Sequence, residues 1–479
     1  MTMLDYFQGT PRRQQAEVLT ALEAQWRPRT CYVVSLPVGA GKSRVAAAIS
    51  GWAASFDKSS AIVPPDGMLQ RQYEKDFPEL ASVWGGDDYY CLPMRQSCAA
   101  TRRKKKSNCK EHCPYSKSTG LARSSMQRLM HVYTYRGVAA KGQRAQALVG
   151  YPKVLIMDEA HRLPDMLHTE VKLWRDRHNW PMDLATVEDF CRWVDRAKDQ
   201  PFAWERAAAK AILLSKTVPG HISKTLDVLR GRGQMVLRIA PLSTRAARPT
   251  LWPRSVDNVI LLSATPGDVV VETGLDKHFD VVHIEGDSPI PPTNRPFNYM
   301  PGVKFTHKHR DPSMKELASL IYETLDHNPQ SGIIHTTYAD AELMRGYLTH
   351  PRLMWHDRAN KSQIYGQFRA AAGSGRVLVA SGMTEGVDLV GDLARWQVLT
   401  KVPFPSLEDS FTAAKAEAYP EWYDGRAVQA ILQAYGRVCR GPEDTGATYM
   451  FDTKFASLYE RRNYLFPPWF KAAVRGLSA

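Results

Sequence analysis

The sequence has 479 residues, of which 44% are hydrophobic and 23% charged, and this balance excludes a disordered chain. No apolar run approaches the roughly 20 residues of a membrane-spanning helix, so we expect no membrane partner. A formal net charge of +14 favours a polyanion such as nucleic acid, and a solvated basic face is the alternative. A chain of this length holds about two to four domains. Residues 1–10 lack the features of a secretory signal, so we expect a reducing, cytoplasmic location.

The chain begins with a predicted helix over residues 11–26, whose apolar side chains recur at helical spacing. Gln14, at the start of this helix, is a candidate contact for a nucleotide base, and a polar surface role is the alternative. The apolar run 31–34 then predicts a buried strand, which leads into a glycine-containing segment. This order of helix, strand and glycine-containing loop is the setting in which a nucleotide site is expected.

The glycine-containing segment, residues 35–44, has the spacing P-x-G-x-G-K-S, with Leu36 in place of the first glycine of the full phosphate-loop pattern. Glycines let backbone N–H groups close around a polyphosphate at the start of a helix, where the helix dipole favours anions. Lys42 is expected to reach the β- and γ-phosphates, and Ser43 to ligate Mg²⁺. The predicted ATP-binding residues of this loop are Gly39, Ala40, Gly41, Lys42, Ser43 and Arg44.

Residues 60–65 predict a second strand and residues 69–77 a helix, after which four of the seven cysteines fall close together. The four are Cys91, Cys98, Cys109 and Cys113. Close thiols in a reducing compartment favour a metal over disulfides, and these wide spacings suit an iron–sulfur cluster. Zinc, whose structural sites have tight pairs at both ends, and unligated thiols are the alternatives.

A basic run lies inside the cysteine segment and is a candidate contact for nucleic-acid duplex or phosphate, with a solvated loop as the alternative. It consists of Arg102, Arg103, Lys104, Lys105 and Lys106. We expect helical structure over residues 117–135. The apolar strand run 153–157 then ends in Asp158-Glu-Ala-His161, where Asp158 would hold Mg²⁺ and Glu159 would position or deprotonate the attacking water.

Residues 162–250 are predicted to be mostly helical, with apolar stripes over 184–194, 202–214 and 222–229. Such stripes indicate core packing, and they predict a helical insertion without chemistry of its own. The runs 235–239 and 259–262 predict strands. The second of these ends in Ser263, Ala264 and Thr265, small residues that we expect to couple a nucleotide site to a neighbouring domain.

A second domain with alternating helices and strands is predicted from about residue 288, which implies a parallel sheet. Its expected elements are a helix over 314–326 and strands over 332–338, 376–380 and 396–400. It has no phosphate loop. Arg437 and Arg440, three apart on a predicted helix, are candidate arginine fingers that complete an ATP site across a cleft, and surface arginines are the alternative.

Taken together, these motifs resemble the iron–sulfur helicases of superfamily 2, the XPD/DinG group, over residues 6–466. The departures are Leu36-Pro-Val in the phosphate loop, Tyr133-Thr-Tyr135 in place of an asparagine-containing motif, and a short arch. The matching stretches are the phosphate loop, Asp158-Glu-Ala-His161, Ser263-Ala-Thr265, Glu385-Gly-Val-Asp388, Lys401-Val-Pro-Phe-Pro-Ser-Leu407, residues 433–445 and the four clustered cysteines.

The resemblance implies an α/β fold with two RecA-like parallel-sheet domains, and an iron–sulfur insertion and a short helical arch in the first. It implies ATP, Mg²⁺ and a [4Fe-4S] cluster as cofactors, and 5′-to-3′ translocation on single-stranded or forked DNA. The remaining ATP-site positions are Gly386, Asp388 and Gln433, and the expected strand contacts are Tyr135, Thr337 and Tyr338.

The predicted organisation interrupts the first RecA-like domain twice and leaves the second continuous. We expect a monomeric DNA helicase; the alternatives are a nucleic-acid-stimulated ATPase or translocase, RNA-directed included, that does not unwind duplexes, and a binding protein with an inactive ATPase fold. The predicted boundaries are 1–83, 117–161 and 235–287 for the first RecA-like domain, 84–116 for the iron–sulfur segment, 162–234 for the arch and 288–479 for the second RecA-like domain.

Overall fold

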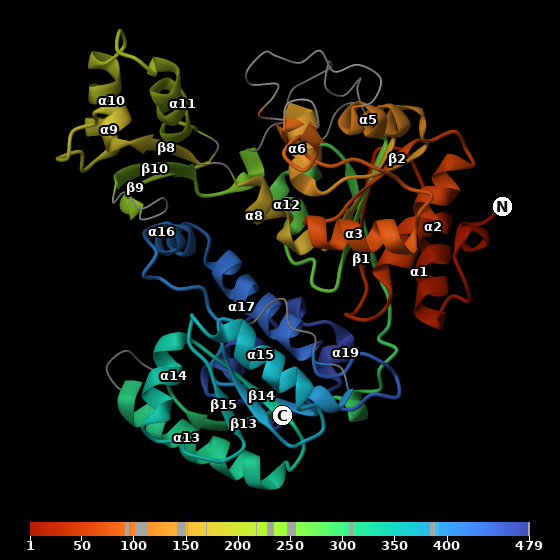
Figure 1. The fold of residues 1–479 in the computed structure, drawn as a ribbon, viewed down its shortest axis with the longest axis vertical. Helices are drawn as coiled ribbons and strands as arrows, with labels where there is room; N and C mark the ends of the chain where they lie inside the picture. Colours follow the sequence, from red (N-terminus) through yellow and green to blue (C-terminus); the bar gives the residue numbers. More distant parts are fainter. Residues whose placement is uncertain are drawn as a thin grey trace. The chain divides into compact units, whose positions relative to one another are not determined.

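The computed structural model divides into two compact units, each containing its own seven-stranded sheet (Figure 1). The first unit comprises Met1–Ser35, Lys42–Glu285 and Ser406–Pro420, and the second comprises Leu36–Gly41, Gly286–Pro405 and Glu421–Ala479. The residues that the structure describes are 1–91, 95–98, 100, 113–140, 150, 152–168, 170–216, 218–227, 234–246, 255–305, 310–383, 389 and 391–477.

The first unit is built on a sheet in which all neighbouring strands run parallel. Its central strands are buried along their whole length, as a sheet covered by helices on both faces requires. In spatial order the strands are β12 (Asp280–Glu285), β1 (Thr30–Ser35), β11 (Asn258–Ser263), β7 (Val154–Asp158), β2 (Ser60–Val63), β6 (Gln127–Leu129) and β3 (Ala81–Ser82).

The helix expected over residues 117–135 is wrong, because β6 interrupts it. Leu129 is fully buried between β2 and β3, and the ladder hydrogen bonds of this inner strand outweigh the local helical pattern. Among the described residues 1–285, the helices outside the insertion are α1 (Arg13–Ala24), α2 (Lys42–Ala54), α3 (Gly67–Asp76), α5 (Pro114–Ser124), α6 (Val132–Ala140), α8 (Leu163–Leu167) and α12 (Val269–Thr273).

The insertion after β7 is mixed rather than helical. Three antiparallel strands, in the order β8 (Val171–Trp174), β10 (Gln234–Pro241) and β9 (Gly220–Asp227), pack against helices around a core of their own (Figure 1). The expected helix over 222–229 is therefore wrong, and residues 235–239 do not join the large sheet. Ile222 and Leu226 suit either period, and pairing with β10 selects the strand. The helices are α9 (Arg175–His178), α10 (Val187–Arg196) and α11 (Ala203–Leu213).

Residues 406–420 follow the second sheet in sequence but belong to the first unit. Their helix α16 (Ser410–Ala418) places the Phe411 ring 4.8 Å from the ring of His168 and 6.1 Å from that of His221. The buried Lys415 ammonium lies 3.3 Å from a Glu272 carboxylate oxygen. Aromatic packing and a buried ion pair thus fix this segment within the first unit.

The second unit also has a fully parallel sheet, which agrees with the predicted fold class. Its strands, in spatial order, are β15 (Leu353–Trp355), β16 (Val377–Ser381), β14 (Gly332–Thr336), β17 (Trp396–Leu399), β18 (Ala447–Asp452), β13 (Phe297–Val303) and β19 (Val474–Arg475). Its helices are α13 (Arg310–His327), α14 (Tyr338–Arg345), α15 (Lys361–Ala370), α17 (Pro420–Tyr435), α18 (Lys454–Arg461) and α19 (Pro468–Lys471). Among the described residues, no helix combines the length and apolar character needed to cross a bilayer.

Candidate nucleotide site

Three of the predicted catalytic residues meet at the carboxyl edge of the first sheet. Lys42 is the first residue of α2, and Asp158 is the last residue of β7 with Glu159 directly after it. The Lys42 Nζ atom lies 3.1 Å from Glu159 Oε1, and the lysine side chain is only 9% exposed. Parallel strands bring their carboxyl ends to one edge, so residues 116 positions apart in sequence form one charged cluster.

Glu159 is held in an unusual backbone conformation between two basic groups. Its φ of 47° lies in the left-handed region, which costs a non-glycine residue about 1 kcal/mol or more. Its Oε2 atom lies 3.3 Å from the Nδ1 atom of His161, opposite the contact with Lys42. The strained backbone therefore aims this carboxylate at the phosphate-loop lysine.

The predicted coupling residues contact the same cluster. The Ser263 hydroxyl, at the end of β11, lies 3.0 Å from His161 Nδ1 and also accepts the N–H of Thr265 at 3.0 Å. Ser263 is fully buried, and Ala264 and Thr265 are almost so. Through His161, this link connects the Ser-Ala-Thr segment with Glu159.

Tyr73 is a site residue that the sequence analysis missed. Its hydroxyl donates to Asp158 Oδ2 at 2.8 Å and is also hydrogen-bonded to Ser43, so it joins both expected Mg²⁺ ligands. Tyr73 lies on the buried face of α3 and is 1% exposed. The sequence signal was weak, because a tyrosine in an apolar helical stripe is ordinarily core.

Burial and the charge of Glu159 raise the pKa of Asp158 to about 6. Burial also acts to raise the pKa of Glu159, but the positive charges of Lys42 and His161 outweigh it and lower that pKa. A buried carboxylate with a raised pKa is stabilised in its ionised form by a cation. The donor set of Asp158 and Ser43 therefore fits Mg²⁺, and Lys42 fits a phosphate.

The phosphate loop has the backbone that its glycines predict. Gly39 and Gly41 have φ values of 80° and 77°, and an added Cβ atom at Gly39 would lie 2.7 Å from the carbonyl oxygen of Arg440 within the second unit. In the same unit, a Cβ atom at Gly436 would lie 2.9 Å from the Cβ atom of Val38. These two glycines allow close backbone packing that no other residue permits.

The prediction that Arg437 and Arg440 share a helical face is wrong, because α17 ends at Tyr435 and both arginines follow it. Gly436 comes directly after the helix end. The turn is held by Gln397, whose Nε2 atom donates to the Ala434 carbonyl at 3.0 Å, while the Arg437 N–H donates to the same oxygen at 3.1 Å. Gln433, the other predicted residue here, remains on the last turn of the helix.

A buried histidine supports this turn. His335 on β14 is hydrogen-bonded through Nε2 to Gln397 Oε1 at 3.1 Å. Burial and the nearby charge of Arg437 lower the pKa of His335 to about 4, so the ring is neutral at pH 7. A neutral polar chain therefore runs from β14 through β17 to the segment that carries Arg437.

Gln14 has the environment expected of a ligand contact. It is 5% exposed, and its Nε2 atom is buried without a hydrogen-bond partner, which is costly in a folded protein. The neighbouring Arg13 side chain is instead 85% exposed and pairs with Glu17. An amide donor with no partner inside the protein fits recognition of a bound base.

The predicted strand contacts fall in different environments. Tyr135 is 4% exposed, whereas Tyr133, two residues earlier, is 58% exposed. Thr337 caps α14 by exchanging hydrogen bonds with Asp340, which orders the start of that helix, and Tyr338 is half-buried. The side chain that this part of the first unit presents to solvent is therefore Tyr133 rather than Tyr135.

The cysteine segment is only partly described. Cys98 is buried, and Cys91 and Cys113 are half-buried. No group of three or more metal-ligating side chains comes together among the described residues. The donor chemistry suits a cluster, but the geometry does not test it, because a predicted ligand lies outside the described residues. The predicted residues outside them are Cys109, Arg102, Arg103, Lys104, Lys105, Lys106, Gly386 and Asp388.

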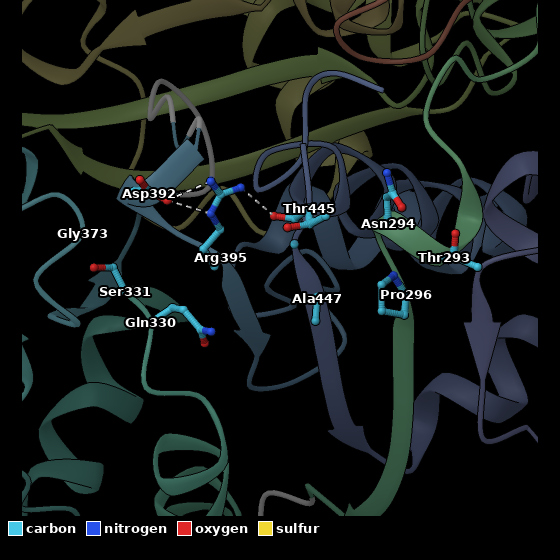
Figure 2. Close-up of a pocket in the computed structure, with 11 residues that line it drawn as sticks. Thr293, Asn294, Pro296, Gln330, Ser331, Gly373, Asp392, Arg395, Thr445 and Ala447 are labelled. Carbon is cyan, nitrogen blue, oxygen red and sulfur yellow. Dashed lines mark hydrogen bonds and ion pairs between the residues drawn. The ribbon is translucent and has the colours of Figure 1, made fainter. Parts of the chain in front are cut away.

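A pocket of about 650 Å³ lies in the second unit, at the edge of the sheet where its strands begin (Figure 2). It opens where β13, β14, β17 and β18 begin, and none of the predicted site residues lines it. Figure 2 shows the Arg395 guanidinium directed at Asp392 and at the backbone of Thr445, and Arg395 also donates to Asp444 at 2.6 Å. These hydrogen bonds stabilise the turn before β18, so Arg395 has a structural role.

Comparisons with known proteins agree with this geometry. Residues 8–180 match the family model described as the res subunit of type III restriction enzymes, and residues 319–473 match a helicase C-terminal domain. A solved XPD helicase aligns with 95% of this chain and 98% of its own, with a TM-score of 0.60 and 13% identity. The predicted resemblance to XPD/DinG-like helicases of superfamily 2 is confirmed by these similarities.

Other known proteins are also similar to this chain. The structure of S. tokodaii Xpd4 has a TM-score of 0.58 and 12% identity over 97% of this chain and 100% of its own. The ATP-dependent DNA helicase YoaA of Escherichia coli is 27% identical over 155 residues, 30% of this chain and 24% of its own. A Drosophila melanogaster homolog of regulator of telomere elongation helicase 1 is 27% identical over 25% of this chain and 13% of its own. The matches thus span less than a quarter of these curated relatives.

Proposed function

We propose that the protein is an ATP-dependent DNA helicase that translocates 5′ to 3′ on single-stranded DNA. The observation that carries the proposal is the cluster of buried Lys42 and Asp158 with half-buried Glu159 at the carboxyl edge of the first sheet. Hydrolysis of ATP requires a cation for the phosphates, a carboxylate for Mg²⁺ and a base for the attacking water, and these three residues would supply them. The similarity to YoaA, named as an ATP-dependent DNA helicase, supports DNA as the substrate.

Each residue of the cluster has a separate task in ATP hydrolysis. Lys42 would bind the β- and γ-phosphates, while Ser43 and Asp158, oriented by Tyr73, would hold Mg²⁺. Glu159, whose lowered pKa keeps it ionised, would accept a proton from the attacking water. The buried Nε2 atom of Gln14 would donate to the base of the nucleotide.

The second RecA-like domain would complete the site by supplying Arg437 and Arg440, with the ATP bound in the cleft between the two domains. A guanidinium stays charged at any physiological pH and suits the charge that develops on a transferring phosphoryl group. Gly386, Asp388 and Gln433 are proposed as further contacts on this side. Closure and reopening of the cleft would then move the two domains along one DNA strand.

The remaining proposals concern metal and DNA. Four thiolates from Cys91, Cys98, Cys109 and Cys113 would hold a [4Fe-4S] cluster that stabilises the segment 84–116. The basic run 102–106 would contact DNA phosphates, and Thr337 and Tyr338 would contact the strand on the second domain. Iron and acid-labile sulfide in protein purified without oxygen, with both lost in Cys113→Ser, would support the cluster; tightly bound zinc would overturn it.

The decisive experiment is ATP-dependent unwinding of matched DNA duplexes with either a 5′ or a 3′ single-stranded tail, under anaerobic conditions. Selective opening of the 5′-tailed duplex is the expected result, and Glu159→Gln should abolish it. Opening of the 3′-tailed duplex alone would overturn the direction. ATPase activity stimulated by single strands, without opening of either duplex, would favour a translocase that remodels nucleoprotein, and the same experiment with RNA strands tests the RNA-directed version.

A further inference from the structure

Arg295 is a charged side chain in the core of the second unit. It lies two residues before β13 and is only 1% exposed. Its guanidinium carbon lies 4.9 Å from the centre of the Trp469 ring and 5.0 Å from that of the Tyr435 ring, and these two rings stack on each other. Arginine keeps its proton even when it is buried, so a full positive charge lies inside this unit.

The protein gives this charge few partners. The Arg295 Nη2 atom donates to the Ser288 hydroxyl at 2.6 Å, but the Nε and Nη1 atoms are buried without a hydrogen-bond partner. Within the described part of the chain, no carboxylate pairs with the guanidinium. The Nε1 atom of the neighbouring Trp469 is a further buried donor without a partner. A buried charge that nothing balances is strongly destabilising, so this cluster of donors indicates a bound anion.

The titratable groups beside Arg295 do not balance its charge. Those that act on it are the Tyr435 hydroxyl and the Cys439 thiol. Burial, and then the charge of Asp444, raises the pKa of Cys439 to about 11, and burial also raises the pKa of Tyr435, so both groups are neutral at pH 7. Helix α17 ends at Tyr435 and offers only the partial negative charge of a helix terminus.

A second buried arginine shows the contrast. Arg206 of the insertion is also 1% exposed and lies 5.5 Å from the centre of the Trp193 ring. Its Nη2 atom donates to the backbone carbonyls of Ala197 at 2.8 Å and Gln200 at 3.0 Å, just after α10 ends. Arg206 therefore caps a helix terminus, where carbonyl groups carry partial negative charge, and this structural role explains its burial.

We propose that the Nε and Nη1 atoms of Arg295 bind a small monovalent inorganic anion, such as chloride, inside the second unit. One such anion balances one buried positive charge, whereas a divalent anion would leave a negative charge unbalanced. The surroundings are aromatic rings and a single hydroxyl, so an anion that loses its water easily suits them better than a strongly hydrated one. The site is independent of the proposed helicase function.

The position of the site gives the anion a structural consequence. The Tyr435 hydroxyl donates to the Arg295 carbonyl at 2.6 Å, so the guanidinium and the end of α17 are held together. A bound anion would therefore stabilise both the start of β13 and the end of α17.

The first test replaces chloride with gluconate, an anion too large for a buried site, at constant ionic strength. We expect chloride to raise the thermal unfolding midpoint in a saturable way, as a ligand that binds only the folded protein does. Arg295→Met should abolish this dependence and, in gluconate, should unfold at or above the midpoint of the parent, because the unbalanced charge is gone. Arg206→Met is the matched control, which should lower the midpoint in both salts and keep the chloride dependence.

Crystals of the parent protein soaked in bromide test the site without a substitution. An anomalous bromide peak beside the Arg295 guanidinium is the expected result. Equal midpoints in both salts without a peak would show that water alone satisfies the two nitrogens, and equal midpoints with a peak would show binding at crystal concentration only; either would overturn the site. A chloride dependence that survives in Arg295→Met would also overturn it, because the anion would then bind elsewhere.

Discussion

The surroundings of Lys42 and Arg437 differ, although both groups are proposed to act on the same phosphates. Lys42 lies in a cluster of charged groups, where Glu159 and Asp158 have shifted pKa values. Arg437 lies beside His335, a neutral ring that belongs to a chain of uncharged hydrogen bonds. The first surrounding suits proton and metal chemistry, whereas the second holds a permanent cation in place.

This difference follows from the chemistry of the two cations. A buried lysine loses its proton readily unless a carboxylate stabilises it, whereas a guanidinium keeps its charge without one. The comparison predicts that substitutions near Lys42 alter proton transfer and the use of Mg²⁺. Substitutions at or near Arg437 should instead alter the form or position of the positive charge.

The largest effect is expected for Arg437→Lys. An ammonium lacks the planar fork of the guanidinium, and arginine fingers contribute about 10³-fold or more to phosphoryl transfer. We expect kcat for single-strand-stimulated ATP hydrolysis to fall about 10³-fold, with Arg369→Lys, an exposed arginine on α15, as the matched control. Activity of Arg437→Lys within a few-fold of the parent would show that Arg437 has no role in the transition state.

Glu159→Gln should lower kcat by about 10²-fold or more, because the amide accepts no proton from water. Nucleotide binding should persist, since Lys42, Ser43 and Asp158 are retained. The measurement is a single-turnover ATPase assay combined with equilibrium binding of ATP, with Glu188→Gln on the exposed face of α10 as control. Equal loss of binding and turnover would mean that Glu159 serves only to position Lys42.

How much the sequence alone could predict depended on whether the signal was local. The phosphate loop and the 153–159 strand end are continuous stretches, so spacing alone placed Lys42, Asp158 and Glu159 correctly relative to their strands. Strand β6 was missed because its three residues are too few to show a strand period. Leu129 belongs to the sheet because β6 pairs with β2 on one side and β3 on the other. Strand β9 was missed because its apolar spacing fits two periods.

Contacts between distant parts of the chain left no local signal. Tyr73 looked like a core residue, and its hydrogen bond with Asp158 joins positions 85 apart. Arg437 and Arg440 looked helical until Gly436 and the Gln397 side chain were seen to end and hold the turn. The fold class was thus accessible from the order of elements, whereas the groups that orient the site required tertiary structure.

His335 provides a test of the neutral surrounding through stability. Its folded pKa of about 4 lies below the unfolded value near 6.5, so the unfolded chain binds more protons between these values. The stabilisation is therefore fully present above about pH 6.5 and is lost as the pH falls toward 4. From pH 7 to pH 5 this histidine alone should lower the free energy of unfolding by about 2 kcal/mol.

The measurement compares urea unfolding of the parent and His335→Gln at both pH values. Glutamine can still donate to Gln397 but does not titrate, so the variant should lose about 2 kcal/mol less than the parent over this range. Other histidines whose pKa is lowered, such as His168 and His221, contribute equally to both proteins and cancel. If both proteins lose the same free energy of unfolding, the pKa of His335 does not change on folding, and its surroundings do not favour the neutral ring.

The smallest effect is expected for Tyr73→Phe, which removes one hydroxyl beneath the charged cluster. That hydroxyl orients Asp158 and contacts Ser43, and loss of such a support typically weakens metal use about tenfold. We expect the Mg²⁺ concentration for half-maximal ATPase activity to rise about tenfold, while kcat at saturating Mg²⁺ stays close to that of the parent. Tyr322→Phe, at a half-exposed tyrosine on α13, is the control. A fall in kcat that excess Mg²⁺ does not restore would mean that Tyr73 acts on the water or the phosphate, and the division of tasks between Asp158 and Glu159 would then be wrong.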